Sequence, residues 1–274
     1  MTAVDERHRV RSRFRPVRSL YAGNARSVMY RGWTATRSTN WLVVVSGFFE
    51  PIFYLLSLGI GLGALVGTVQ SGGQDIPYAA FIAPALLAVA AMNGAVYDST
   101  WNVFFKMQYA KLYEGMLATS LGPLDVALCE ISLALLRGGF YASGFLIVMQ
   151  ALGLNLSWWA ILALPAVLLI AFGFASLGMA ITSYMKTFQQ MDWVNFILLP
   201  MFLFSATFYP LTVYPEWIQW IIQALPLWHG VELVRGLTTG AVELGLLWHV
   251  LYYLVMIAIG LVFTTKRLRA LFLD

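Results

Sequence analysis

Six long apolar stretches constrain this chain more than any other feature of its sequence. An α-helix needs about 20 apolar residues to cross the roughly 30 Å of hydrocarbon in a bilayer. The stretches run from about Trp41 to Val66, Tyr78 to Phe104, Leu124 to Leu152, Trp158 to Tyr184, Trp193 to Phe208 and Leu244 to Phe263. The sequence therefore predicts an all-α integral membrane protein with six transmembrane helices.

Composition supports a membrane environment. The chain is 60% hydrophobic and 11% charged, whereas soluble domains carry about 25% charged residues. So few charges cannot cover a water-facing surface. The first apolar stretch is too long for a signal-peptide core and no small-residue cleavage site follows it, so we expect it to be retained. Cys129 is the single cysteine, and we interpret it as a buried, inert thiol.

The basic residues predict the orientation. Nine arginines lie between Arg7 and Arg37, and six further basic residues fall in the segments on the same side: Lys106, Lys111, Lys186, Lys266, Arg267 and Arg269. Because basic residues concentrate in cytoplasmic segments, we expect both termini inside the cell. This distribution is typical of membrane topology and argues against a nucleic-acid partner.

The chain divides into two parts. Residues 1–38 are predicted to be a cytoplasmic basic tail with an amphipathic helix on the inner leaflet, although a plain solvated tail fits the sequence equally well. Residues 39–274 form the membrane domain.

The connection between the last two spans is broken by prolines. Pro200, Pro210, Pro215 and Pro226 cannot all lie inside one uninterrupted helix, and the apolar runs between them are too short to span a bilayer. We predict two short re-entrant helices, about Glu216–Ala224 and Leu227–Leu237, that dip into the outer leaflet.

Several motifs together resemble the ABC-2 transporter permeases, in particular the subfamily of nodulation lipo-oligosaccharide export and antibiotic-resistance permeases. The resemblance covers about Arg31 to Arg269, and the Arg-rich tail departs from it. The motifs are the Phe204-Ser205 step, Pro210, Pro215-Glu216-Trp217, Leu225-Pro226, Glu232-Leu233-Val234-Arg235, Glu50-Pro51 with residues 58–63, residues 83–87, Ala91-Met92-Asn93 and residues 113–119.

The resemblance implies a multi-pass subunit of a bacterial plasma-membrane exporter. It implies a second permease copy or paralogue, and two ATPase subunits that hold ATP and magnesium on the cytoplasmic side. The cargo would be an amphiphile, such as a lipid-linked glycan, a glycolipid or a hydrophobic drug. The broken outer helices would cap the exit path, with these residues at it: Phe208, Pro210, Pro215, Trp217, Pro226, His229, Glu232 and Arg235.

One independent observation agrees with a separate ATPase. A nucleotide-binding loop of the Walker type ends in Gly-Lys, and none of the four lysines follows a glycine. We therefore expect no cofactor, catalytic residue or metal in this chain. The alternatives are an ATP-independent secondary transporter or channel, which usually shows inverted repeats, and a membrane enzyme, which needs a catalytic cluster.

The segment from Phe105 to Gly122 is predicted to carry the helix that couples to the ATPase. Tyr109, Leu112, Tyr113 and Met116 recur at helical spacing, beside the polar Lys111 and Glu114. This apolar face is expected to sit in a groove of the ATPase, with Glu114 making a polar contact. A helix that rests on lipid headgroups is the alternative.

Three ionisable residues fall inside the predicted spans: Glu50, Glu130 and Arg137. Because charges in a bilayer are usually paired, we hypothesise that Arg137 pairs with Glu50, or failing that with Glu130. The pair would be static or would contact substrate. Gly59, Gly63 and Gly67, spaced by four, indicate close helix packing, either within the chain or at a dimer seam.

Overall fold

The computed structural model describes Tyr30, Phe49 and residues 52–119 and 121–272. The predicted basic tail, the start of the first span and Glu50 lie outside the described residues.

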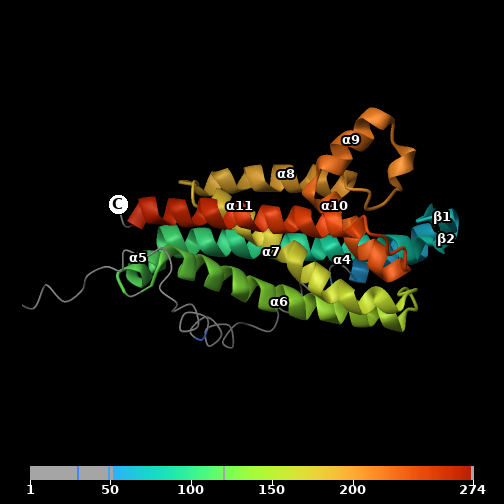
Figure 1. The fold of residues 1–274 in the computed structure, drawn as a ribbon, viewed down its shortest axis with the longest axis horizontal. Coiled ribbons are helices and arrows are strands. Elements are labelled where there is room, and N and C mark those ends of the chain that lie inside the picture. The colour runs from blue at the N-terminus through green and yellow to red at the C-terminus, as the bar shows by residue number, and fades with distance from the viewer. Residues whose placement is uncertain (1–29, 31–48, 50–51, 120, 273–274) are drawn as a thin grey trace, which may run out of the picture.

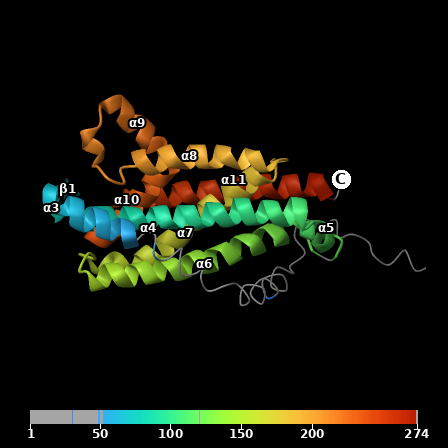
Figure 2. The same ribbon diagram turned by 180° about the vertical axis from the view of Figure 1, so that it is seen from behind.

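The described helices form an elongated bundle in which five of them lie side by side (Figures 1 and 2). One end of the bundle carries α5 and the end of α11, and we call it the α5 end. The opposite end carries the hairpin β1–β2, and we call it the hairpin end. The five helices are α4 (Tyr78–Tyr97), α6 (Pro123–Ala151), α7 (Ala163–Thr182), α8 (Met191–Phe204) and α11 (Leu246–Phe272).

Helix α4 is the buried centre of the bundle. Residues 80–89 are all buried, and α4 packs against α6, α7 and α10. A helix that is apolar on every side is expected in such a position, because neighbouring helices surround it along residues 80–89. Helices α6 and α11, in contrast, bury only one side and expose apolar residues such as Phe140, Ile147, Leu251 and Leu254.

Four helical segments of the described chain are long and apolar enough to cross a membrane. They are Tyr78–Tyr109, Pro123–Ala151, Trp158–Thr182 and Leu246–Phe272, and they correspond to the second, third, fourth and sixth predicted stretches. Helix α8 has 14 residues, which is about 21 Å at 1.5 Å per residue and less than the roughly 30 Å of hydrocarbon. The fifth span therefore stays a prediction.

The first apolar stretch is described only in part, as an apolar helix from Ile52 to Val66 that contains η3 (Leu55–Leu62) and α3 (Gly63–Val66). A Cβ on Gly59 would lie 3.3 Å from the Cβ of Ala79 in α4. At Gly59 the structure thus shows packing within the chain. Gly67 ends the helix with a φ of 72°, a conformation that glycine adopts without strain.

The helical run of α4 continues through two π-helical turns, η4 (Asp98–Asn102), which lies inside the predicted stretch, and η5 (Phe105–Tyr109), which extends beyond its predicted end at Phe104. A π-turn shifts the backbone hydrogen bonds from the i−4 to the i−5 spacing and frees a carbonyl. Thr182 of α7 donates its hydroxyl to the Ser99 carbonyl at 3.2 Å. The helical run ends where Lys111 adopts a φ of 48°, and α5 (Leu112–Leu117) follows.

A small hairpin replaces the loop predicted between the first two stretches. Strands β1 (Thr68–Ser71) and β2 (Gln74–Pro77) pair antiparallel, with Val69 opposite Ile76. Gly72 and Gly73 form the turn with φ values of 57° and 75°. Two-residue hairpin turns favour positive φ at both positions, and a Gly-Gly pair provides this.

The proline-broken segment folds as two helices, as predicted. Helix α9 spans Glu216–Ala224 and α10 spans Pro226–Thr239. Helix α9 projects from the bundle (Figure 1), whereas α10 packs against α4, α7 and α11. Three short 3-10 turns complete the order of elements: η6 (Trp158–Leu162), η7 (Phe188–Gln190) and η8 (Leu211–Val213).

Helices α7 and α11 approach each other closely at Gly260. A Cβ on Gly260 would lie 2.6 Å from the carbonyl carbon of Ser176, and a backbone atom cannot move aside cheaply. We predict that Gly260→Ala lowers the free energy of unfolding by about 1–3 kcal/mol, because overpacking forces the helices apart. Thermal unfolding of the purified protein in detergent measures the loss.

Gly94→Ala is the matched control, because Gly94 also lies inside a helix but an added Cβ there meets no atom within 4 Å. Equal melting temperatures for Gly260→Ala and the unmodified chain would contradict the close-packing argument.

Candidate functional site

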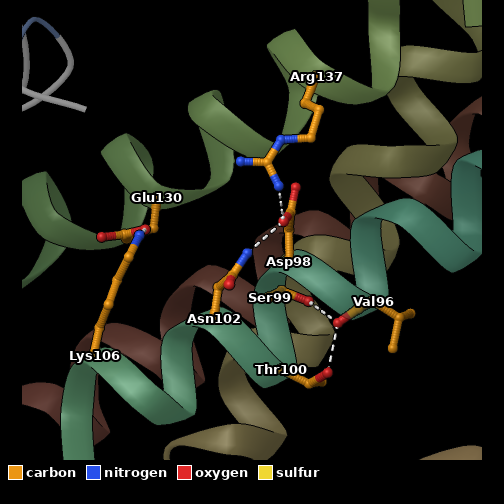
Figure 3. A network of polar contacts seen from close by, with 8 residues as sticks. All are labelled: Val96, Asp98, Ser99, Thr100, Asn102, Lys106, Glu130 and Arg137. Carbon is orange, nitrogen blue, oxygen red and sulfur yellow. Dashed lines mark hydrogen bonds and ion pairs between the residues drawn. The ribbon is translucent and has the colours of Figure 1, made fainter. Parts of the chain in front are cut away.

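The central polar feature of the bundle is an ion pair between α6 and the first π-turn of α4 (Figure 3). The Nη1 of Arg137 lies 2.6 Å from the Oδ1 of Asp98, and the Nδ2 of Asn102 donates to the same oxygen at 2.6 Å. Arg137 therefore pairs with a residue that the sequence interpretation did not consider. Glu50, the partner expected first, lies outside the described residues.

Glu130, the partner expected second, is occupied elsewhere. Its Oε2 lies 2.5 Å from the Nζ of Lys106, so two ion pairs of opposite polarity link the same two helices (Figure 3). Asp98, Asn102 and Lys106 follow one another at intervals of four residues and share one helix face. Because Asp98 lies inside a predicted span, the rule that flagged Arg137 would also have flagged Asp98.

A cavity of about 790 Å³ opens beside the Asp98–Arg137 pair. Its walls come from α4, η4, α6, α8 and Tyr54 of the first apolar helix. Asn93, Tyr97 and Leu199 line it and are exposed, so the cavity is open to the surface of the chain. Among the described lining residues, Asp98 and Arg137 are the charged ones. This volume is within the range of small-molecule sites.

The predicted coupling segment divides into two faces. Tyr113 and Met116 are buried, at 0% and 6% exposure, and α5 packs against α6 and η5. Tyr109, Lys111, Leu112 and Glu114 are exposed. The expectation of one docking face with all four apolar residues is therefore corrected. Tyr113 and Met116 anchor α5 to its own bundle, and the exposed residues remain available to a partner.

Arg235, predicted to lie at the exit path, holds helices together within the chain, and its place on an exit path stays a prediction. Its side chain is buried and donates to the carbonyl of Ala206 at 2.8 Å, to the carbonyl of Phe81 at 3.3 Å and to Glu232 at 2.7 Å. The guanidinium also lies 3.9 Å from the centre of the Phe81 ring. Arg235 thus ties α10 to α4 and to the bend after α8, where Ala206 has a φ of 54°.

His229 is likewise buried, at 4% exposure. Its Nδ1 lies 2.7 Å from the Nδ1 of His249, so one ring donates a hydrogen bond and the other accepts it. In the part of the chain that the structure describes, no three His, Cys, Asp or Glu residues gather as a metal site would require. His229 therefore joins α10 to α11, and its place on an exit path stays a prediction.

The other predicted exit residues differ in exposure. Trp217 on α9 is 67% exposed, and Pro215 is also exposed. Phe208 is half-buried against Phe202, with ring centres 5.1 Å apart. Pro210, Pro226 and Glu232 are half-buried. Their place on an exit path stays a prediction.

Comparison with known proteins identifies the family. Residues 24–239 match the family model described as ABC-2 type transporter. The chain belongs to the ABC-2 type transporter family. The match covers α3 to α10 and therefore includes both ion pairs, the cavity and the proline-broken segment.

Relatives of this ABC-2 chain are nodulation proteins of rhizobia. Nodulation protein J of Rhizobium leguminosarum bv. viciae is 29% identical over 92% of this chain and 97% of its own. Its counterpart from R. leguminosarum bv. trifolii is 30% identical over 89% and 92%, and that of Sinorhizobium fredii is 31% identical over 76% and 79%. The resemblance to the nodulation export permeases is confirmed, and the chain is a multi-pass membrane subunit of an ABC exporter.

We predict that Arg235→Lys opens the segment after α8 in this ABC-2 subunit. A lysine cannot reach both carbonyls and stack on Phe81, and hydrogen bonds to charged groups contribute about 1.5–3 kcal/mol each. Thr207→Cys, made in a Cys129→Ala background, places the single thiol at a buried position in this segment. The thiol becomes accessible to a reagent when the segment opens. We expect its labelling by a maleimide to accelerate by about tenfold or more.

Glu232→Gln is the control, since glutamine retains an acceptor for Arg235 and leaves the two carbonyl contacts in place. Unchanged labelling in Arg235→Lys would show that Arg235 does not hold this bend.

Proposed function

We propose that this chain is the membrane half of an ATP-driven exporter that moves an amphiphile outward across the bacterial plasma membrane. Membership of the ABC-2 family carries this proposal. The sequence contains no Gly-Lys pair with which a phosphate-binding loop ends. ATP and magnesium are therefore bound by a separate ATPase, of which two copies serve a pair of permease chains.

The anchoring of α5 supports its role as the part that receives force from the ATPase. Tyr113 and Met116 fix one side of α5 against the bundle, while Leu112 and Glu114 face outward. Only the break at Lys111 separates α5 from the helical run that begins at Tyr78. A partner that moves α5 thus also moves α4 and η4, and with them Asp98 at the cavity.

The cavity supports an amphiphilic cargo. It combines apolar side chains of α4 and α8 with a charged pair and amides in one continuous wall. A lipid-linked glycan or a glycolipid has both kinds of surface, and the resemblance to the nodulation lipo-oligosaccharide export permeases favours these over a purely apolar drug.

The proposed topology has six spans, including α8 and the partly described first helix, with both termini in the cytoplasm. We predict that green fluorescent protein fused after Asp274 fluoresces and that alkaline phosphatase fused there is inactive. Phosphatase inserted after Gly153, between α6 and α7, is expected to be active, because that turn lies on the side poor in basic residues. The opposite pattern at either site would contradict the topology.

We predict that the chain copurifies with an ATPase encoded by a neighbouring gene and stimulates its ATP hydrolysis in lipid. Glu114→Arg is expected to reduce copurification and stimulation by about tenfold, because it reverses a charge on the exposed face of α5. Asp75→Arg, the same change in the hairpin at the opposite end of the bundle, is the control.

Failure of the unmodified pair to associate, or uphill transport by the permease alone in sealed vesicles, would overturn the proposed function. Equal effects of Glu114→Arg and Asp75→Arg would leave the exporter intact but contradict the place of the ATPase contact.

A further inference from the structure

We propose that the cavity beside α4 binds the cargo by its headgroup, and that the Asp98–Arg137 pair selects heads that are uncharged and rich in hydroxyl groups. The inference deepens the proposed function, because the ligand is the exported amphiphile. Binding itself requires neither ATP nor the ATPase.

The charged groups of the cavity lining gather toward the α5 end of the bundle. Asp98, Arg137 and Asn195 lie there, beside the apolar Val194 and the ring of Trp101. Toward the hairpin end the lining is apolar, with Leu86, Val89, Leu198, Leu199 and Phe202. An amphiphile therefore fits in one direction, with its head near η4 and its chain along α4 and α8.

Among the described residues that line the polar end, the charges balance. Asp98 and Arg137 lie 2.6 Å apart, and the Asp98 side chain is only 10% exposed. An anionic head that accepts from the remaining N–H groups of Arg137 would lie beside the Asp98 carboxylate, and like charges repel strongly where little water screens them. A cationic head at Asp98 would meet the guanidinium of Arg137 in the same way. A neutral head avoids both penalties.

Hydroxyl groups fit this pair because each one both donates and accepts a hydrogen bond. The Asp98 carboxylate has acceptor capacity beyond its bonds to Arg137 and Asn102, and the guanidinium of Arg137 carries five N–H donors, of which one meets Asp98. Arg137 is 28% exposed at the cavity. Vicinal hydroxyls of a sugar can bridge the two groups without separating them.

Aromatic rings at the polar end supply a surface for the ring of a sugar. Tyr97 and Trp101 both line the cavity and stack, with ring centres 6.1 Å apart and an angle of 22° between the rings. The C–H face of a pyranose packs on such rings, whereas an acyclic zwitterionic head such as phosphocholine offers neither that face nor vicinal hydroxyls. The geometry therefore favours a glycosyl head over a phospholipid head.

The test uses the purified full chain in amphipol, without ATPase or nucleotide. The probe is decyl glucoside with a diazirine at the end of its chain. Its competitors are decyl glucoside, decyl phosphate, decyl phosphocholine and decyl trimethylammonium, all below their critical micelle concentrations. Mass spectrometry locates the crosslink. We expect labelling of α8 near Leu198 and Phe202, and competition by the glucoside at concentrations about tenfold lower than by the other three.

Two variants reverse the charge balance of the cavity. Asp98→Asn leaves an unpaired cation, so decyl phosphate should become the strongest competitor. Arg137→Gln leaves an unpaired anion, so decyl trimethylammonium should become the strongest. If the pair had only a structural role, each variant would weaken competition by all four ligands to a similar degree and would leave their order unchanged. Glu130→Gln is the matched control, because the Lys106–Glu130 pair joins the same helices but neither residue lines the cavity. We expect this variant to rank the four competitors as the unmodified chain does.

Equal competition by all four ligands, a preference for phosphocholine, or labelling away from α8 in the unmodified chain would each overturn the inference, whether or not the variants fold. If the unmodified chain shows the expected order of competitors but does not export with an ATPase and ATP, the proposed function is contradicted and the inference about the cavity stands. The two failures are therefore distinguishable.

Discussion

The structure depends on one constraint, which is that helix α4 is enclosed by its neighbours over most of its length and must satisfy most of its polar groups within the protein. Asp98, Asn102 and Lys106 follow its inner surface, and α6 supplies Arg137 and Glu130 opposite them. The carbonyl of Ser99, in the first π-turn, lies 3.2 Å from the hydroxyl of Thr182 in α7, which also lies 2.8 Å from the carbonyl of Gly178 in its own helix. Because each of these contacts fixes a neighbouring helix against α4, the polar groups also determine the register of the bundle.

The same constraint explains the broken segment near the hairpin end. Prolines interrupt the helices there, and the freed carbonyls of a buried backbone need donors. Arg235 donates to the carbonyl of Ala206 in the bend after α8 and also to the carbonyl of Phe81 in α4, and Glu232 partly balances its charge. A residue that reads as part of an exit path is therefore part of the scaffold, and so is His229 with its partner His249. Among the described residues, the Asp98–Arg137 pair differs from Arg235 and His229 in that it lines a cavity that is open to the surface.

Sequence reasoning succeeded where a local pattern is sufficient. The length of apolar runs predicted the helices α4, α6, α7 and α11, and the prolines predicted α9 and α10 within two residues. It failed where the outcome depended on distant partners. Tyr113 and Met116 recur at the spacing of a docking face, but the bundle buries them. The hairpin at residues 68–77 was missed because each strand has only four residues, although Gly72-Gly73 is a turn signal.

By itself, the sequence determined that this chain is a helical membrane protein with a broken segment before its last span, because hydropathy over about 20 residues and proline chemistry are properties of a single segment. The ABC-2 type followed from the resemblance of its motifs to a known family. Only the tertiary structure decided which charges meet. The sequence offers Glu50, Asp98 and Glu130 as partners for Arg137. The packing of α6 against η4 and η5 pairs Arg137 with Asp98, and Lys106 with Glu130. Pairing between helices is set by their rotation and register, which result from the packing of the whole bundle and are not encoded in any one helix.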